Sequence, residues 1–270
     1  MENSLYGAEN ILSNLKISPV PVIGITGPPG AGKSTLVAAL IDELSKQQCK
    51  VAVLAVDPTS PFTSGSLLGD RVRMQNFSLR TDVYIRSVAT RGELGGLSGK
   101  IIEMTDVLKS CEFDYILVET VGVGQSEVEI AGLADITLVT LVPESGDEIQ
   151  SIKAGIMEIG DAFIVNKGDR EGADRLVENL QRLTRPLKIP VFKTIATKQK
   201  GINELVSFIQ THHSSPEVKL DLLSRKAWSL IKEKRMADID LKMLRREIAE
   251  ESRAKDFNLY KFVNSRFRNS

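Results

Sequence analysis

A glycine-rich loop between a predicted strand and a predicted helix is the feature that most constrains the fold. Residues 20–26 form an apolar run typical of a buried strand, and apolar residues recur at helical spacing over 36–44. The loop between them fits the pattern G-x-x-x-x-G-K-[ST], which surrounds phosphate oxygens with backbone N–H groups at the positive end of a helix. A plain strand-to-helix turn is the competing interpretation. The loop residues are Gly27, Pro28, Pro29, Gly30, Ala31, Gly32, Lys33, Ser34 and Thr35.

Predicted strands and helices alternate along most of the chain. The strands are near-continuous apolar runs, as expected for strands buried on both faces, at 22–26, 51–56, 83–88, 115–118, 136–142, 162–165 and 191–195. Helical patterns cover 34–46, 99–109, 148–159, 173–184 and 202–210. This order predicts an α/β fold of the P-loop NTPase kind, a mostly parallel sheet with helices on both faces. Ligands of such sheets bind at the carboxyl ends of the strands.

Three segments are expected. Residues 1–19 form a short N-terminal helical extension, 20–213 the nucleotide-binding domain, and 214–270 a C-terminal helical arm that begins with the breaker Ser-Ser-Pro. Residues 217–252 lack Gly and Pro, which predicts a helix. Its apolar residues recur at helical spacing at Leu220, Leu223, Ala227, Leu230 and Ile231. This stripe needs a partner surface, either the chain's own domain or a second protein.

Composition excludes several classes of function. The chain has 35 basic and 35 acidic residues, so no overall basic excess points to nucleic acid as a partner. No apolar run approaches the roughly 20 residues that cross a bilayer, and the N-terminus lacks the pattern of a secretory signal. The two cysteines are far apart in sequence, typical of a reducing compartment. We therefore expect a cytoplasmic protein without a membrane segment.

A second motif follows the predicted strand 162–165. Asn166, Lys167 and Asp169 form the pattern N-K-x-D. A single carboxylate at Asp169 accepts both the ring N–H and the exocyclic amine of guanine, whereas adenine would leave it desolvated and unpaired. Asn166 would steady the loop, and the stem of Lys167 would lie along the base. Together with the phosphate loop this predicts GTP over ATP. A polar turn after a strand is the alternative.

Carboxylates at strand ends provide candidates for Mg²⁺. Ser34 opens the first helix, Asp57 ends one strand, and Glu119 ends another where a Walker B residue is expected. Because Mg²⁺ takes few protein ligands, we expect Ser34 with one or two of Asp57, Asp70 and Glu119. Asp57 could instead only start a loop, and Asp70 could cap a short helix over 71–77.

Hydrolysis needs charge stabilisation and a positioned water. Lys33, which would reach the β- and γ-phosphates, supplies the first, together with Mg²⁺ and the amides of the phosphate loop. Gly122 marks the switch that follows. Gln125 is the candidate to position the water, and the sequence leaves open whether it reaches it. Arg91 is either a partner-dependent charge stabiliser or an ordinary surface arginine. We expect a slow basal rate of GTP hydrolysis.

Taken together, these residues resemble the MeaB/ArgK family of P-loop GTPases, in the SIMIBI class. The resemblance covers 22 to about 205 and is carried by GITGPPGAGKST, AVDPTSPFTSGSLLGDRVRM, SVATRGELGGLSG, ETVGVGQSE, ESGDEIQSIKAGIMEIGD and NKGD. It implies a homodimeric GTPase that uses GTP, GDP and Mg²⁺. It also implies a chaperone that gates adenosylcobalamin loading of a methylmalonyl-CoA mutase type of enzyme and protects that mutase.

The resemblance also implies a switch that relays nucleotide state to the mutase. Its residues would be Glu144, Asp147, Glu148, Gln150 and Lys153. A loop that enters a helix capped by Asp147 is the simpler interpretation.

The sequence also departs from the family pattern. The serine-alanine pair expected in the second base-contact loop is Ile195-Ala196, which leaves Ala196 and Thr197 to meet the base. The segment 1–19 is shorter than the family's usual N-terminal extension. Two other functions stay open: a GTPase that inserts nickel, and a kinase or ATPase of a lysine, arginine and ornithine transport system.

Overall fold

The computed structural model covers the 270-residue chain. It describes residues 7–57, 77, 79–89, 99–120, 129–145, 156–213, 215–236, 239, 241–253 and 257–267.

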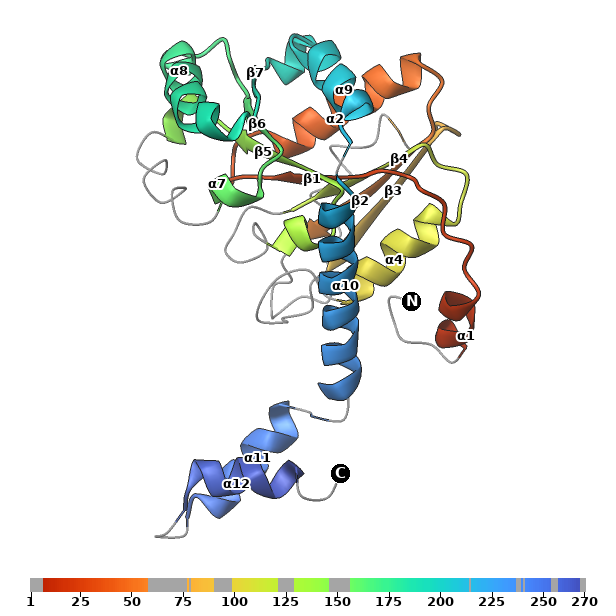
Figure 1. Ribbon diagram of the computed structural model, residues 1–270, viewed down its shortest axis with the longest axis vertical. Coiled ribbons are helices and arrows are strands. Elements are labelled where there is room, and N and C mark those ends of the chain that lie inside the picture. Colours follow the sequence, from red (N-terminus) through yellow and green to blue (C-terminus); the bar gives the residue numbers. More distant parts are fainter. Residues whose placement is uncertain are drawn as a thin grey trace. The chain divides into compact units, whose positions relative to one another are not determined.

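One seven-stranded parallel sheet forms the centre of the larger unit (Figure 1). Its spatial order is β3-β2-β4-β1-β5-β6-β7, with β1 in the middle. The predicted α/β class is therefore confirmed. The strands are β1 (Val22–Thr26), β2 (Val51–Asp57), β3 (Val83–Ala89), β4 (Tyr115–Glu119), β5 (Ile136–Leu141), β6 (Ala162–Val165) and β7 (Val191–Lys193).

Helices cover both faces of the sheet. Figure 1 shows α2 (Lys33–Lys46) and α9 (Ile202–Thr211) on one side and α4 (Gly99–Lys109) on the other. Alternate residues of each strand point to opposite faces, so β5 serves two cores. Ile136 and Leu138 belong to the core under α2 and α9, whereas Val139 and Leu141 pack with α8 (Ala173–Thr184). Burial of both faces explains why the strands read as unbroken apolar runs.

Shorter elements complete the chain. They are the helices α1 (Ala8–Ser13) and α7 (Ile156–Ile159), and the 3₁₀ turns η2 (Ile130–Gly132), η3 (Pro143–Ser145), η4 (Arg185–Leu187) and η5 (Ala196–Lys198). Three helices follow α9: α10 (Pro216–Met236), α11 (Leu241–Glu251) and α12 (Leu259–Phe267).

The continuous helix predicted over 217–252 is wrong, because α10 ends at Met236 and α11 begins at Leu241. Two aspartates, Asp238 and Asp240, stand in the interval. Aspartate favours helix starts over helix interiors, since its carboxylate competes for nearby backbone N–H groups. The expectation should have included a break there.

The chain divides into two compact units, residues 1–226 and 227–270. Within the second unit, Phe257 and Phe262 pack with their ring centroids 6.2 Å apart. Arg266 lies over the Phe262 ring and forms an ion pair with Glu247. These contacts hold α12 against α11.

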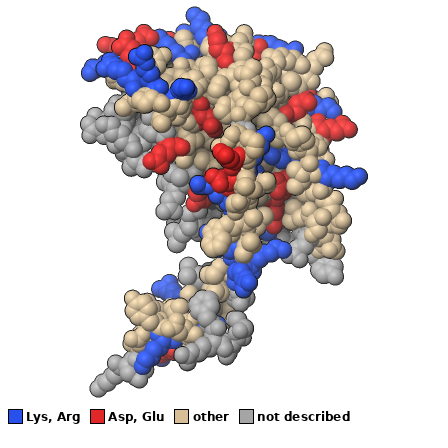
Figure 2. Space-filling view, in the orientation of Figure 1, with Lys and Arg blue, Asp and Glu red and all other residues tan. Residues whose placement is uncertain are grey.

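Charge is mixed on the surface. Figure 2 shows Lys and Arg interspersed with Asp and Glu on the face of the larger unit in view, in keeping with a formal net charge of zero. Among the described helices, none combines the length and apolarity needed to span a bilayer.

Candidate functional site

The phosphate loop leaves the carboxyl end of the central strand. Gly27, Gly30 and Gly32 have φ values of 134°, 76° and 82°, in the left-handed region that glycine adopts without strain. Gly27 is further constrained by packing, because a Cβ there would lie 2.0 Å from the Thr140 carbonyl oxygen of β5. Gly32 then caps α2, whose first residue is Lys33. The loop thus places the positive end of α2 beside its own backbone amides.

Lys33 turns back into this loop. Its Nζ donates to the carbonyl oxygens of Gly27 at 2.8 Å and Pro28 at 3.0 Å, and the residue is 6% exposed. A buried ammonium is costly unless it is hydrogen-bonded, and the loop carbonyls meet that need. The loop therefore holds a positive charge inside the curve where phosphate oxygens are expected.

The predicted metal residues Ser34 and Glu119 come together. The Ser34 hydroxyl donates to Glu119 Oε1 at 2.6 Å, joining the start of α2 to the end of β4. Glu119 is 9% exposed. Just beyond it, the Thr120 hydroxyl donates to Thr26 Oγ1 at 3.1 Å, which ties the ends of β4 and β1 together. The two oxygen groups are thereby fixed beside the phosphate loop.

Asn166 connects the two predicted nucleotide motifs. Its Nδ2 donates to the carbonyl oxygen of Ala31 at 3.1 Å, within the phosphate loop. Its Oδ1 accepts from the Thr194 hydroxyl at 3.2 Å and from the Ala196 backbone N–H at 3.3 Å. One buried amide thus joins three segments: the phosphate loop, the end of β6 and the loop after β7.

The rest of the N-K-x-D motif runs outward, from a partly buried Lys167 to an exposed Asp169. Lys167 has a φ of 53°, and its Nζ donates to the Gly30 carbonyl at 2.7 Å. The Gly168 backbone N–H donates to the Thr194 carbonyl oxygen at 2.9 Å. Asp169 forms a 2.9 Å ion pair with Lys198, and both side chains are exposed. Hydrogen bonding from Lys198 holds the pKa of Asp169 below its usual range.

Glu144, predicted as a switch residue, also reaches this motif. It follows β5 in η3 and forms an ion pair with Arg170, the residue directly after Asp169. Hydrogen bonding from Arg170 lowers the pKa of Glu144. The segment after β5 is thus connected to the loop after β6.

The remaining predicted site residues are described in part or lie outside the described residues. The Asp57 backbone ends β2, but its side chain lies outside the described residues. Thr197 lies in η5 and is exposed, and Thr35 lies in the first turn of α2. The predicted residues wholly outside the described part of the chain are Asp70, Arg91, Gly122, Gln125, Asp147, Glu148, Gln150 and Lys153.

Sequence reasoning missed Thr194, Lys198 and Arg170. The position of Thr194 carried a usable signal, because it comes directly after β7, next to the N-K-x-D strand in the sheet. Lys198 and Arg170 gave none, since a charged surface residue in a loop is the common case.

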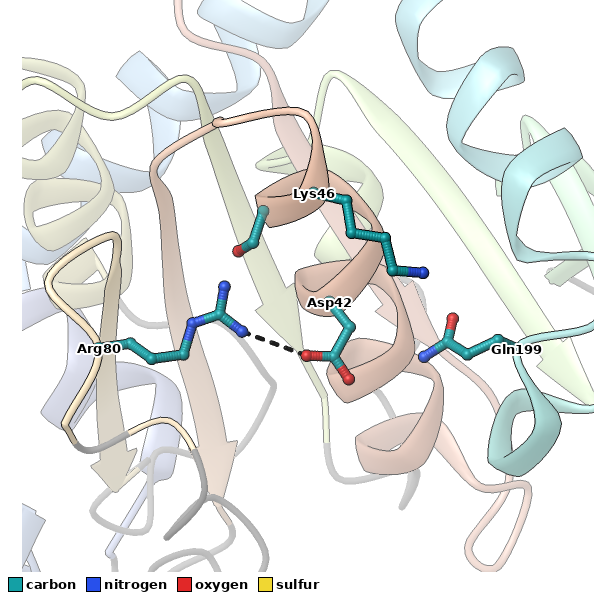
Figure 3. A pocket seen from close by; sticks show the side chains of 5 residues that line it. Asp42, Lys46, Arg80 and Gln199 are labelled. Atoms are coloured by element: carbon teal, nitrogen blue, oxygen red, sulfur yellow. Dashed lines mark hydrogen bonds and ion pairs between the residues drawn. The ribbon is translucent and has the colours of Figure 1, made fainter.

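A pocket of about 370 Å³ is lined by residues of α2, by Arg80 before β3 and by Gln199 after η5 (Figure 3). In the close-up, the Arg80 guanidinium points at Asp42 of α2, with a 3.2 Å ion pair, and Gln199 approaches Asp42 from the other side. Arg80 also binds Asp82 at 2.7 Å and holds the pKa of that carboxyl far below its usual range. These contacts fasten α2 to the start of β3 and so support the helix that carries Lys33.

A parallel sheet whose central strand leads through a glycine-rich loop into a helix defines a P-loop nucleoside triphosphatase. The sequence belongs to a specific group within that class. The family described as methylmalonyl-CoA mutase-associated GTPase MeaB matches residues 7–247, so this chain belongs to the MeaB family of GTPases. The predicted family and the predicted GTPase class are confirmed.

Individual relatives agree with this assignment. A protein of Pyrococcus abyssi described as a GTPase is 48% identical over 225 residues, which cover 78% of this chain and 69% of the relative. GTPase ArgK of Escherichia coli is 44% identical over 147 residues, covering 54% of this chain and 44% of that protein. Across such relatives the chain spans between 37% and 69% of their length.

A solved structure shares the fold. The crystal structure of an LAO/AO transport system kinase matches with a TM-score of 0.66 at 23% identity, and covers 97% of this chain and 86% of that one. At this identity the likeness shows the fold alone.

Proposed function

We propose that this protein binds and hydrolyses GTP with Mg²⁺, and that it acts as a chaperone for an adenosylcobalamin-dependent mutase of the methylmalonyl-CoA mutase type. The family description, a mutase-associated GTPase, supports the partner. The single observation that supports nucleotide binding is the set of hydrogen bonds from Asn166, which joins the phosphate loop to the loop after β7. Bound GTP would have its phosphates at Lys33 and its guanine base at Asp169.

The residues present fit a magnesium ion. Mg²⁺ prefers oxygen ligands, and the Ser34 hydroxyl and the Glu119 carboxylate lie 2.6 Å apart beside the loop. When bound, Mg²⁺ would neutralise charge on the β- and γ-phosphates. Asp57 and Asp70 remain candidates for the same site.

The chain's own groups would perform the remaining steps. Lys33 would exchange its two carbonyl partners for phosphate oxygens, so that the same ammonium binds the ligand without moving far. Asp169 would exchange Lys198 for the guanine N–H groups. Gln125 is proposed to position the water, with a slow basal rate that a partner accelerates.

Partner contact is assigned to the switch and to the arm. Glu144 is tied to the N-K-x-D loop through Arg170, which gives nucleotide occupancy a physical connection to the segment after β5. The apolar stripe of α10 stays exposed within this chain: Leu220 is 65% exposed and Leu223 is 63% exposed. We assign that stripe to a homodimer contact or to mutase docking. The free cysteines Cys49 and Cys111 suit a cytoplasmic location.

Co-purification tests the proposal. The full chain would be mixed with candidate adenosylcobalamin-dependent mutases in the presence of GDP, a non-hydrolysable GTP analogue, or no nucleotide. A complex whose stability depends on the nucleotide is expected. The absence of such a complex with every candidate would overturn the chaperone role, and transfer of label from γ-labelled GTP to a protein would favour the transport kinase instead.

A further inference from the structure

A second cavity opens at the amino ends of the strands, opposite the end that carries the phosphate loop. Its volume is about 420 Å³, and its lining includes Pro21, Tyr115 and Ile136, which lie at the amino ends of β1, β4 and β5. The phosphate loop and Glu119 lie at the carboxyl ends of those strands. Because a five-residue strand spans roughly 17 Å, a nucleotide on the phosphate loop would leave this cavity open.

The lining of this cavity is rich in basic groups. Lys109, Lys219 and Lys226 contribute ammonium groups, and His212 and His213 contribute imidazoles. Asp135 is the acidic residue of the lining, and it already accepts from the Val22 backbone N–H at 2.8 Å and from Lys109 at 3.4 Å. The cavity thus has more cationic groups than its own carboxylate can neutralise.

Lys226 is the unusual member of this set. It is 8% exposed, and among the described residues no hydrogen bond or ion pair within 4.0 Å reaches its ammonium group. Burial, and then the charge of Lys109, lower the pKa of Lys226, while the charges of Asp135 and Asp106 act in the opposite direction. The Lys226 nitrogen is not among the fully buried atoms that lack a hydrogen bond, so the ammonium group meets solvent while the rest of the side chain is buried.

Two neighbouring carboxylates, Asp106 and Asp135, act on Lys226 through their charge. Asp106, on α4, is itself partly buried, and burial raises its pKa. Asp161 lies 3.7 Å from His212, and its Oδ2 accepts from the Thr137 backbone N–H at 2.7 Å. Asp135 and Asp161 are therefore already engaged by other groups.

We propose that this cavity binds a small anion, carrying a phosphate or a carboxylate, through Lys226 with Lys109 and Lys219. The volume suits a ligand of metabolite size, and the apolar lining from Pro19, Leu222 and Leu223 would accept the rest of such a molecule. An anion on Lys226 connects the start of the sheet to α10. The site would therefore report the concentration of that anion to the helix that leads into the C-terminal arm.

The test uses the full chain saturated with GDP and Mg²⁺, so that the phosphate loop is filled. Sodium phosphate and sodium succinate are titrated separately at constant ionic strength, and the heat of binding and the unfolding temperature are measured. At least one anion is expected to bind and raise the unfolding temperature. The two arms distinguish a phosphate ligand from a carboxylate ligand.

Lys226→Met should weaken that binding about tenfold or more, since a charge-assisted hydrogen bond contributes roughly 1.5–3 kcal/mol. Met keeps the length of the side chain and the packing of its buried stem, so the fold should remain stable. Lys232→Met, at an exposed lysine of the same helix, is the matched control and should bind as the unmodified chain does. A second variant, Lys219→Met, should weaken binding less.

Two results would overturn the proposal. One is that neither anion binds the GDP-saturated protein. The other is that Lys226→Met and Lys232→Met bind the anion with equal affinity. Neither result bears on GTP binding or on the mutase, because both are measured with the nucleotide site filled.

Discussion

The two ends of the nucleotide site are built differently. At the phosphate end, Lys33 and Glu119 are almost fully buried and hydrogen-bonded to the chain itself. At the base end, Asp169 is held by an ion pair with Lys198 in which both side chains are exposed. The first arrangement is fixed by packing, whereas solvent competes for the ion pair of the second.

This difference separates affinity from selectivity. A buried, preorganised phosphate end would bind any nucleoside triphosphate tightly, because little would have to move when the ligand arrives. The exposed base end would then choose guanine by exchanging one partner of Asp169 for another. Asn166 belongs to both ends, so it is the residue through which the two could affect each other.

The largest effect is expected from Gly27→Ala. Its Cβ would meet the Thr140 carbonyl at 2.0 Å, and the φ of 134° adds strain, so we expect a loss of about 3 kcal/mol or more in unfolding free energy. Gly30→Ala is the matched control: its φ is 76°, with open space around the added carbon, and about 1 kcal/mol is expected. Urea unfolding measures both. Equal losses would show that packing against β5 does not fix the loop.

Lys33→Met should be next in size. Loss of the ammonium at the phosphate end should reduce single-turnover GTP hydrolysis by about 10²–10³-fold, the usual range for removing one group that stabilises transition-state charge. Lys167→Met removes a lysine of the base end that contacts Gly30 from an exposed position, and only a few-fold loss is expected. Similar losses in the two variants would break the comparison.

Asn166→Ala should weaken both ends together. The buried partners on Ala31, Thr194 and Ala196 would lose their hydrogen bonds, at a cost of about 1–3 kcal/mol. We expect weaker binding of GTP and of inorganic triphosphate alike, measured by calorimetry. If only GTP binding falls, the residue serves the base and does not join the two ends.

The smallest effect is expected at Lys198. In Lys198→Met the pKa of Asp169 should rise toward its ordinary value, so the acid limb of GTP binding should move to higher pH, because guanine recognition needs the carboxylate. GTP affinity at neutral pH should change by no more than about fivefold, since exposed pairs contribute about 0.2–1 kcal/mol.

Asp169→Ala, by contrast, should abolish the preference for GTP over ITP, which lacks the exocyclic amine. A preference that survives in Asp169→Ala would remove the residue from base recognition.

Much of the fold was predictable because it depends on local patterns. All seven strands lie where apolar runs predicted them, and α4 and α8 have the predicted bounds. The meeting of Ser34 with Glu119 followed from topology, since the loop that leads to Ser34 leaves the carboxyl end of β1 and Glu119 ends the neighbouring strand β4. A buried strand and a glycine-rich turn leave few alternatives, so the sequence is sufficient.

The unpredicted contacts depend on tertiary structure. Lys198 and Arg170 have long, exposed side chains, and nothing local determines which carboxylate each one binds. Lys226 is a similar case. The apolar stripe of α10 predicted that Leu220 and Leu223 would be buried against a partner. In this structure both leucines are exposed, and Lys226 is the residue of α10 that is buried. Helical spacing identifies a face, but not which protein covers it.

The central position of β1 has a consequence for synthesis on the ribosome. Residues 27–35 and Glu119 emerge first, together with the strands on one side of β1, whereas β5, β6 and β7 on the other side emerge later. Gly27 packs on Thr140 and the loop binds Asn166, so the phosphate loop gains its supports only after those later residues appear. A nascent chain would therefore carry the whole P-loop motif before it could bind a nucleotide tightly, and GTP binding would mark a completed sheet.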